Sequence, residues 1–147
     1  MIKNIYSKNI IYGNTKDSII EISLLMKKNN IGFIPLKEND NYVGVITDRD
    51  ICISLPNIKS LNDSVKDYMS QNIISIDISK SIDEALNLMK KYKIKRLLVK
   101  EKDNIKGILS LSDILNNTID ILNTYKTIFN IYDSKENICA TVDEFYL

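Results

Sequence analysis

The chain has 147 residues, 44% of them hydrophobic, and its 20 basic and 19 acidic side chains give a net charge of +1. This composition is that of a folded protein and excludes a wholly disordered one. The interspersed charges give no electrostatic reason to expect a nucleic-acid partner or a membrane surface, and no apolar run reaches the roughly 20 residues of a membrane span.

The N-terminal part of the chain predicts a lead-in, a strand and a helix. Met1–Asn9 is mixed in character, and we expect a turn of helix there without the apolar core of a signal peptide. The β-branched run Ile10–Tyr12 predicts a short strand. Ser18 and Glu21 then form a capping-box pattern, in which a hydroxyl and a carboxylate satisfy first-turn amides at the start of a helix.

Two further strands and a second helix follow. Phe33–Leu36 and Tyr42–Ile46 are strand-like and are joined by a polar turn. Because Pro35 cannot donate a ladder hydrogen bond, we expect its strand to lie at a sheet edge or to bend there. The helix after the second strand is short because Pro56 ends it.

The second half of the chain repeats this order. The string Gly44–Ile51 recurs as Gly107–Ile114, and at the same offset the likeness extends without gaps over Ile5–Cys52 and Tyr68–Leu115. A repeat of this length predicts two copies of one structural unit. We therefore predict an α+β (mixed α/β) fold with two pseudo-symmetric β-α-β-β-α repeats, each too small to bury a good core alone, so that they pack on each other.

The predicted boundaries follow from the repeat. They are a first repeat at residues 1–56, a linker at 57–64, a second repeat with an extended C-terminal helix at 65–132, and an acidic tail at 133–147. In the extended helix, apolar residues from Leu111 to Tyr132 alternate steps of four and three. Two interpretations stay open: the helix covers its own domain, or its exposed end packs against a second chain.

Two hydroxyl–carboxylate pairs, Thr47 with Asp50 and Ser110 with Asp113, stand where a strand leads into a helix. Such pairs are common helix N-caps that need no ligand. The functional interpretation is a nucleotide site, because a carboxylate can accept hydrogen bonds from two sugar hydroxyls and a neighbouring hydroxyl can donate to phosphate.

The tandem repeat and these two strings resemble the cystathionine-β-synthase (CBS) domain pair, also called a Bateman module, over roughly residues 1–120. The resemblance implies two CBS repeats related by a pseudo-dyad and packed as a CBS pair, with two potential nucleotide sites in a cleft between their sheets. It also implies a stand-alone bacterial module that binds adenine nucleotides, regulates a partner and pairs into homodimers.

The resemblance implies roles for individual residues. Asp50 and Asp113 match the ribose-binding acids, and Thr47 and Ser110 match hydroxyls that face phosphate or ribose. Pro35 matches a proline that lines the base pocket.

Charged residues near these pairs differ between the copies. Arg49 is expected to neutralise phosphate in the first site, where the second copy has Ser112. Lys95 and Arg96 match a basic pair with the same purpose, although they could equally be a solvated strand end; the first copy has Gly32–Phe33 there.

The adenine is implied to meet the backbone edge of a strand in each copy. The matching residues are Ile11 and Tyr12 in the first copy and Ile74 and Ser75 in the second. Tyr12 could stack on a base, or it could be an ordinary core or rim tyrosine.

The function predicted from the sequence is a non-catalytic regulatory module that binds AMP, ADP, ATP or cyclic di-AMP and regulates an unidentified partner protein in trans. No cofactor is required, and the chain forms a homodimer. The alternative is a ligand-free dimerisation module that acts through protein contacts alone. An enzyme is disfavoured because the chain has no His, no Walker-type glycine loop and no metal-ligand cluster. Two isolated cysteines, Cys52 and Cys139, suggest a cytoplasmic location.

Overall fold

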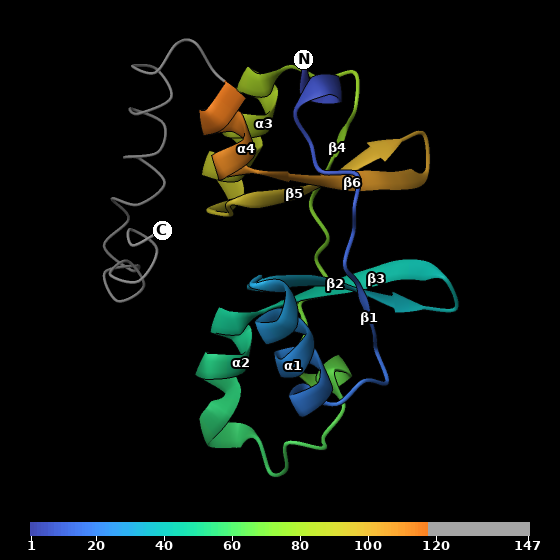
Figure 1. The fold of residues 1–147 in the computed structure, drawn as a ribbon, viewed down its shortest axis with the longest axis vertical. Coiled ribbons are helices and arrows are strands. Elements are labelled where there is room, and N and C mark those ends of the chain that lie inside the picture. The colour runs from blue at the N-terminus through green and yellow to red at the C-terminus, as the bar shows by residue number, and fades with distance from the viewer. Residues whose placement is uncertain (118–147) are drawn as a thin grey trace. The chain divides into compact units, whose positions relative to one another are not determined.

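The computed structural model describes residues 1–117, which are coloured along the chain in Figure 1. The apolar stripe beyond Asn117 and the acidic tail at 133–147 lie outside the described residues. The chain divides into two compact units. The first-repeat unit is Ile10–Ile74, and the second-repeat unit joins Met1–Asn9 to the residues from Ser75 onward.

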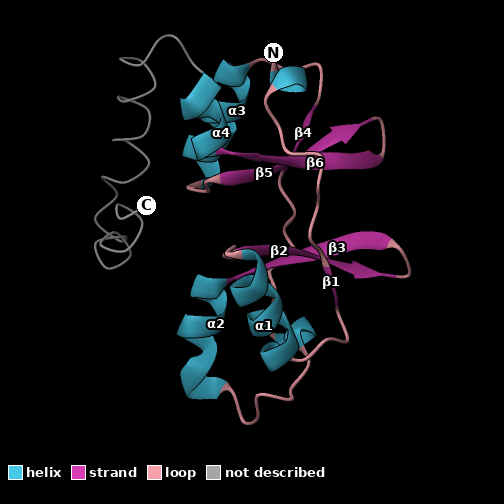
Figure 2. Cartoon of the chain, in the orientation of Figure 1, coloured by secondary structure: helices cyan, strands magenta, loops and turns pink. Residues whose placement is uncertain are grey.

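The first-repeat unit is a three-stranded sheet with helices on one face (Figure 2). Its β1 is parallel to β2, and β2 is antiparallel to β3. The turn between β2 and β3 has two residues of positive φ, Asn39 and Asp40, as tight hairpins require. The elements in chain order are β1 (Gly13–Asn14), α1 (Ile19–Asn29), β2 (Phe33–Glu38), β3 (Asn41–Thr47), α2 (Asp48–Ser54) and the 3-10 turns η2 (Leu55–Asn57) and η3 (Val65–Asp67).

The second-repeat unit has the same order and the same strand pairing. Its elements are η1 (Ile2–Asn4), β4 (Ser75–Asp77), α3 (Ile82–Tyr92), β5 (Arg96–Glu101), β6 (Asn104–Ser110) and α4 (Leu111–Asn117). The predicted α+β class and the two β-α-β-β-α repeats are therefore confirmed.

Helix starts and core faces follow the local sequence. Ser18 and Glu21 close a capping box at α1, and Ser81 and Glu84 close another at α3. The hydrogen bond from Lys80 to Glu84, together with the capping bond from Ser81, lowers the pKa of Glu84 from 4.5 to about 2. Behind the first box, the apolar face of α1 enters a core cluster that consists of Ile19, Ile22, Met26, Ile34, Leu36, Ile46 and Val65.

The lead-in of the chain packs on the second repeat, not on the first. Ile2 is fully buried in the second-repeat unit. Ser7 pairs with Ile108 of β6: each backbone N–H donates to the other's carbonyl at 2.9 Å. Gly107 has no side chain at this contact, and a Cβ there would collide with the Ser7 carbonyl and the Tyr6 ring.

The segment before the second repeat makes the reciprocal contact with the first repeat. Val65 is buried in the core of the first-repeat unit. Ser70 pairs with Val45 of β3 through two backbone hydrogen bonds of 2.9 Å. At the adjacent Gly44, a Cβ would lie 2.7 Å from Met69 Sδ and 2.8 Å from the Ser70 carbonyl. The two repeats have therefore exchanged their lead-in segments.

An ion pair attaches the exchanged η3 turn to β2. Lys66 Nζ donates to Glu38 Oε1 at 2.8 Å, and Thr15 Oγ1 donates to the same oxygen at 3.3 Å. The hydrogen bond from Lys66 lowers the pKa of Glu38, and the same bond raises the pKa of Lys66. Ser64 Oγ donates to the Thr15 carbonyl at 2.6 Å beside this pair.

Two strand predictions need correction. The predicted strand at Ile10–Tyr12 is wrong, since β1 begins at Gly13, where pairing with Leu36 starts. Of the two alternatives for Pro35, the edge strand is wrong, because β2 is the central strand. The other alternative, a bend, agrees with the register shift between Leu36 and Lys37. Pro35 is tolerated because it needs no hydrogen bond from its nitrogen at this position. Its partner on β3, Val45, directs its own N–H and carbonyl to Ser70 and not to Pro35. The Pro35 nitrogen therefore faces the β1 side of the strand, just before β1 begins to pair with β2.

Within residues 1–117, no helix is long and apolar enough to cross a membrane. The described residues also contain no group of three or more His, Cys, Asp or Glu side chains that could hold a metal ion.

Candidate functional site

Each repeat closes its hydroxyl–carboxylate pair into the same set of hydrogen bonds. In the first-repeat unit, Thr47 N–H and Oγ1–H donate to Asp50 Oδ2 at 2.8 and 2.7 Å, and Asp50 N–H donates back to Thr47 Oγ1 at 3.1 Å. In the second-repeat unit, Ser110 and Asp113 make the corresponding bonds at 2.8, 2.6 and 3.1 Å. Both pairs therefore form a helix cap from their own side chains and backbone.

The capping arrangement leaves one carboxylate oxygen of each pair available. The bonds to the Asp50 and Asp113 carboxylates all fall on Oδ2, and among the described residues no hydrogen bond falls on either Oδ1. Both side chains are half-buried and not sealed from solvent. A second oxygen in this position could accept hydrogen bonds from sugar hydroxyls while the cap stays closed.

The start of the neighbouring strand lies beside each pair. In the second-repeat unit, Arg96 is the register partner of Ser110, and the Lys95 carbonyl accepts from Leu111 N–H at 2.8 Å. The structure thus brings the predicted basic pair, Lys95 and Arg96, next to Ser110 and Asp113. Arg49 is exposed on α2 at the position after Asp48 in the first-repeat unit.

The other predicted residues of the first repeat belong to the same sheet. Pro35 lies two residues from Phe33, which is the register partner of Thr47. Ile11 and Tyr12 directly precede Gly13, whose partner is Leu36, so the Tyr12 backbone reaches the Pro35 end of β2. In the second repeat, Ser75 opens β4 opposite Leu98, whereas Ile74 is the last residue of the first-repeat unit.

Tyr12 belongs to an aromatic cluster that the sequence analysis did not identify. Lys37 Nζ lies 4.1 Å from the centre of the Tyr12 ring and 4.8 Å from that of Tyr42. The two rings meet edge to face with centres 6.3 Å apart. Burial raises the pKa of Tyr42, and Tyr12 adds to this effect. The contact between Lys37 and Tyr42 could have been predicted from the sequence, since the predicted hairpin turn places these two residues opposite each other.

Comparisons with known proteins identify this arrangement. A sequence model described as "CBS domain" matches residues 2–57 and 65–120. The Bacillus subtilis (strain 168) protein YlbB is 31% identical over 116 residues, which cover 77% of this chain and 78% of YlbB. The CBS domain-containing protein YhcV of the same organism is 28% identical over 138 residues, which cover 93% of this chain and 97% of YhcV.

One similar solved structure contains bound ligands. It is the CBS domain pair of protein MJ0100 in complex with 5′-methylthioadenosine and S-adenosyl-L-methionine. It is 28% identical, has a TM-score of 0.70, and covers 79% of this chain and 97% of that chain.

Proposed function

The chain belongs to the CBS domain family as a tandem pair of CBS domains, and on that premise we propose that it is a non-catalytic regulatory module for an adenine-containing ligand. The ligand acts as a regulator and not as a required cofactor, and AMP, ADP, ATP and cyclic di-AMP are the candidates. In this proposal the protein is a cytoplasmic homodimer that acts on a separate partner protein.

The observation that carries the proposal is the duplicated pair itself. Asp50 and Asp113 each keep an oxygen outside the capping box, beside a strand start that could contact phosphate or base. The MJ0100 pair is bound to two adenosine derivatives, which supports adenosine as the common part of the ligand. In the proposed site, Thr47, Arg49 and Asp50 act in the first repeat, with Ile11, Tyr12 and Pro35 around the base. The proposed residues of the second repeat are Ser110, Asp113, Lys95, Arg96 and Ser75, and Ile74 directly precedes Ser75 in the chain.

The alternative is a ligand-free dimerisation module. Two observations favour it: each hydroxyl–carboxylate pair already serves as a helix cap, and α2 with its following turn exposes Ile53 at 61% and Leu55 at 54%. Exposed apolar side chains of this size are common at protein–protein contacts.

Thermal unfolding of the purified full chain against AMP, ADP, ATP, cyclic di-AMP, 5′-methylthioadenosine and S-adenosylmethionine separates the two functions. A ligand at a hundred times its Kd adds about 2.7 kcal/mol, which raises the Tm by roughly 5–10 °C in a chain of this length. We expect this shift for at least one compound. No shift with any of them, in protein freed of carried-over nucleotide, would favour the dimerisation module.

The variants need a control for the lost cap. Asp50→Ala and Asp113→Ala should each lower Tm and also reduce the ligand-induced shift. Glu21→Ala and Glu84→Ala remove the carboxylate of an equivalent capping box on α1 and α3, away from the proposed sites. They should each lower Tm slightly, because a capping box is lost, while leaving the ligand-induced shift intact.

A further inference from the structure

The two repeats place opposite charges at an equivalent backbone contact beside the hydroxyl–carboxylate pair. In the first-repeat unit, Asp48 N–H donates to the Gly32 carbonyl at 3.2 Å. At the matching position of the second-repeat unit, Leu111 N–H donates to the Lys95 carbonyl at 2.8 Å. The same backbone hydrogen bond therefore holds together a Gly–Asp pair in one unit and a Lys–Leu pair in the other.

In the first-repeat unit, a carboxylate occupies the space above Gly32. A Cβ on Gly32 would collide with Asp48 Oδ2 and would lie 2.7 Å from its Cγ. Asp48 is exposed, and its Oδ1 accepts from Arg49 N–H at 2.7 Å. Phe33 follows Gly32, so the strand start opposite Thr47 adds an aromatic ring and no charge.

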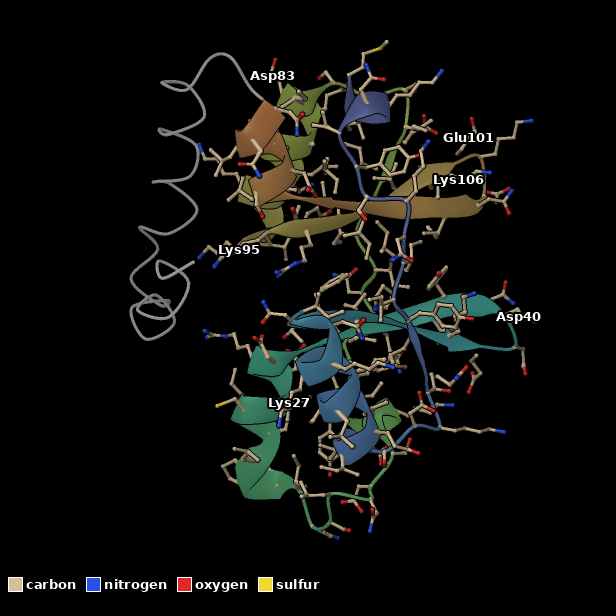
Figure 3. The ribbon with its side chains drawn as sticks, in the orientation of Figure 1. Lys27, Asp40, Asp83, Lys95, Glu101 and Lys106 are labelled. Carbon is tan, nitrogen blue, oxygen red and sulfur yellow. The ribbon has the colours of Figure 1, made fainter. Side chains whose placement is uncertain are left out.

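In the second-repeat unit, the same place is basic. Leu111 is 5% exposed and carries no charge, whereas Lys95 provides an ammonium group and Arg96, opposite Ser110, provides a guanidinium group. In Figure 3, Glu101 and Lys106 lie near the β5–β6 hairpin turn, and Lys95 lies at the opposite end of these strands.

The local charge balance is inverted as a result. At positions 32–33 and 47–50, the first repeat has two carboxylates, Asp48 and Asp50, and one cation, Arg49. At the equivalent positions 95–96 and 110–113, the second repeat has two cations, Lys95 and Arg96, and one carboxylate, Asp113. A nucleoside monophosphate carries close to two negative charges at neutral pH. A phosphate is therefore repelled by the first arrangement and attracted by the second.

We propose that the first-repeat site selects adenosine-type ligands without a phosphate, that the second-repeat site selects phosphorylated adenine nucleotides, and that Asp48 is the residue that rejects phosphate. This inference rests on the proposed function, since it concerns the ligand class of the same two sites. It means that one chain senses two chemically different adenosine compounds, one in each repeat.

The test is calorimetric titration of the full chain with adenosine and with AMP, which differ by the phosphate alone. Asp113→Ala disables the second-repeat site, so that only the first can bind, and Asp50→Ala does the reverse. Where alanine prevents folding, Asp→Asn replaces it, because asparagine keeps a capping oxygen. The measured quantity is the ratio of AMP affinity to adenosine affinity within one variant, so any loss of stability cancels. We expect a ratio about tenfold below one in Asp113→Ala and about tenfold above one in Asp50→Ala.

Charge-matched substitutions then test Asp48 itself. Asp48→Asn in the Asp113→Ala background should raise the ratio by about tenfold. The affinity for AMP should rise, and the affinity for adenosine should stay the same. Asp40→Asn is the control, because it removes the same charge from the hairpin turn of the same unit (Figure 3). The turn lies about 20 Å along the strands from Asp48, beyond the screening length, so Asp40→Asn should leave the ratio unchanged.

The outcomes separate this inference from the proposed function. Equal ratios in the two single-site variants, or an effect of Asp48→Asn no larger than that of Asp40→Asn, would overturn the charge selection while leaving adenosine binding in place. If neither adenosine nor AMP binds the unsubstituted chain, the proposed nucleotide function fails for these ligands and the inference fails with it.

Discussion

Replacing Gly107 by Ala tests the exchange of lead-in segments. Gly107 does not have a positive φ, so alanine introduces no backbone strain there, and the effect is one of space. The added Cβ meets the Ser7 carbonyl and the Tyr6 ring. The carbonyl cannot retreat alone, since it accepts from Ile108 N–H at 2.9 Å in a bridge of two hydrogen bonds. The lead-in must therefore move away from β6.

The size of the effect follows from what this movement breaks. Two backbone hydrogen bonds contribute about 1 kcal/mol each, and the burial of Ile2, which is complete, contributes about 1.5–3 kcal/mol. Part of the Ile2 contact can survive a small shift. We therefore expect Gly107→Ala to lower the free energy of unfolding by about 2–4 kcal/mol, and the Tm by roughly 5–15 °C.

Urea unfolding and amide hydrogen exchange measure this effect. The Ile108 amide should exchange slowly in the unsubstituted chain and quickly in Gly107→Ala. Gly32→Ala is the control, because there the three atoms nearest to the added Cβ all belong to the exposed Asp48 carboxylate, which can rotate away. Its effect should stay within about 0.5 kcal/mol. Equal stability of the two variants, with the Ile108 amide still protected in Gly107→Ala, would refute the tight docking of the lead-in.

Three further predictions concern burial and charge. Ile2→Ala should lower the free energy of unfolding in urea by about 2–5 kcal/mol, because the Ile2 side chain is fully buried although it is next to the N-terminus. Ile53→Ala, at an exposed position, should change this free energy little, and equal losses in the two variants would contradict the burial of Ile2. The low pKa of Glu84 stabilises the fold above its ordinary value of 4.5, and this contribution is lost as the pH falls towards about 2. Glu84→Gln should therefore flatten the stability profile in this range, and an unchanged profile would exclude the ion pair with Lys80. Lys66→Met should raise the pKa of Glu38 in an NMR titration, since the Lys66 hydrogen bond is the main cause of its depression, and an unmoved pKa would show that the contact is absent in solution.

The helix starts could be predicted from the sequence because their hydrogen bonds connect residues three positions apart. A Ser or Thr with an acid three positions on, directly before an apolar run of helical spacing, indicates such a start. The duplicated element order was predictable for a similar reason, since apolar spacing within a segment indicates helix or strand. The pairs that the structure confirms are Ser18 with Glu21, Thr47 with Asp50, Ser81 with Glu84, and Ser110 with Asp113.

The sequence could not show on which repeat a lead-in segment packs. Gly44 and Gly107 are equivalent positions, as are Ser70 and Ser7, so each lead-in carries the features needed to dock on either sheet. The first residue of β1 could not be predicted either, because it depends on where the parallel pairing with Leu36 of β2 begins. Both features depend on contacts between residues far apart in sequence. Because the two repeats are similar in sequence, docking of a lead-in on its own repeat or on the other repeat would use nearly the same local features.

By itself, the sequence determined the two repeats, their element order and the hydroxyl–carboxylate pairs, because each of these depends on spacing within one segment. Only the tertiary structure decided which residues from different segments become neighbours. Gly32 and Asp48 are brought together by a hydrogen bond between two elements, as are Lys95 and Leu111. The charge that each repeat presents beside its hydroxyl–carboxylate pair is thus a property of the folded chain, since it arises from residues that are distant in sequence.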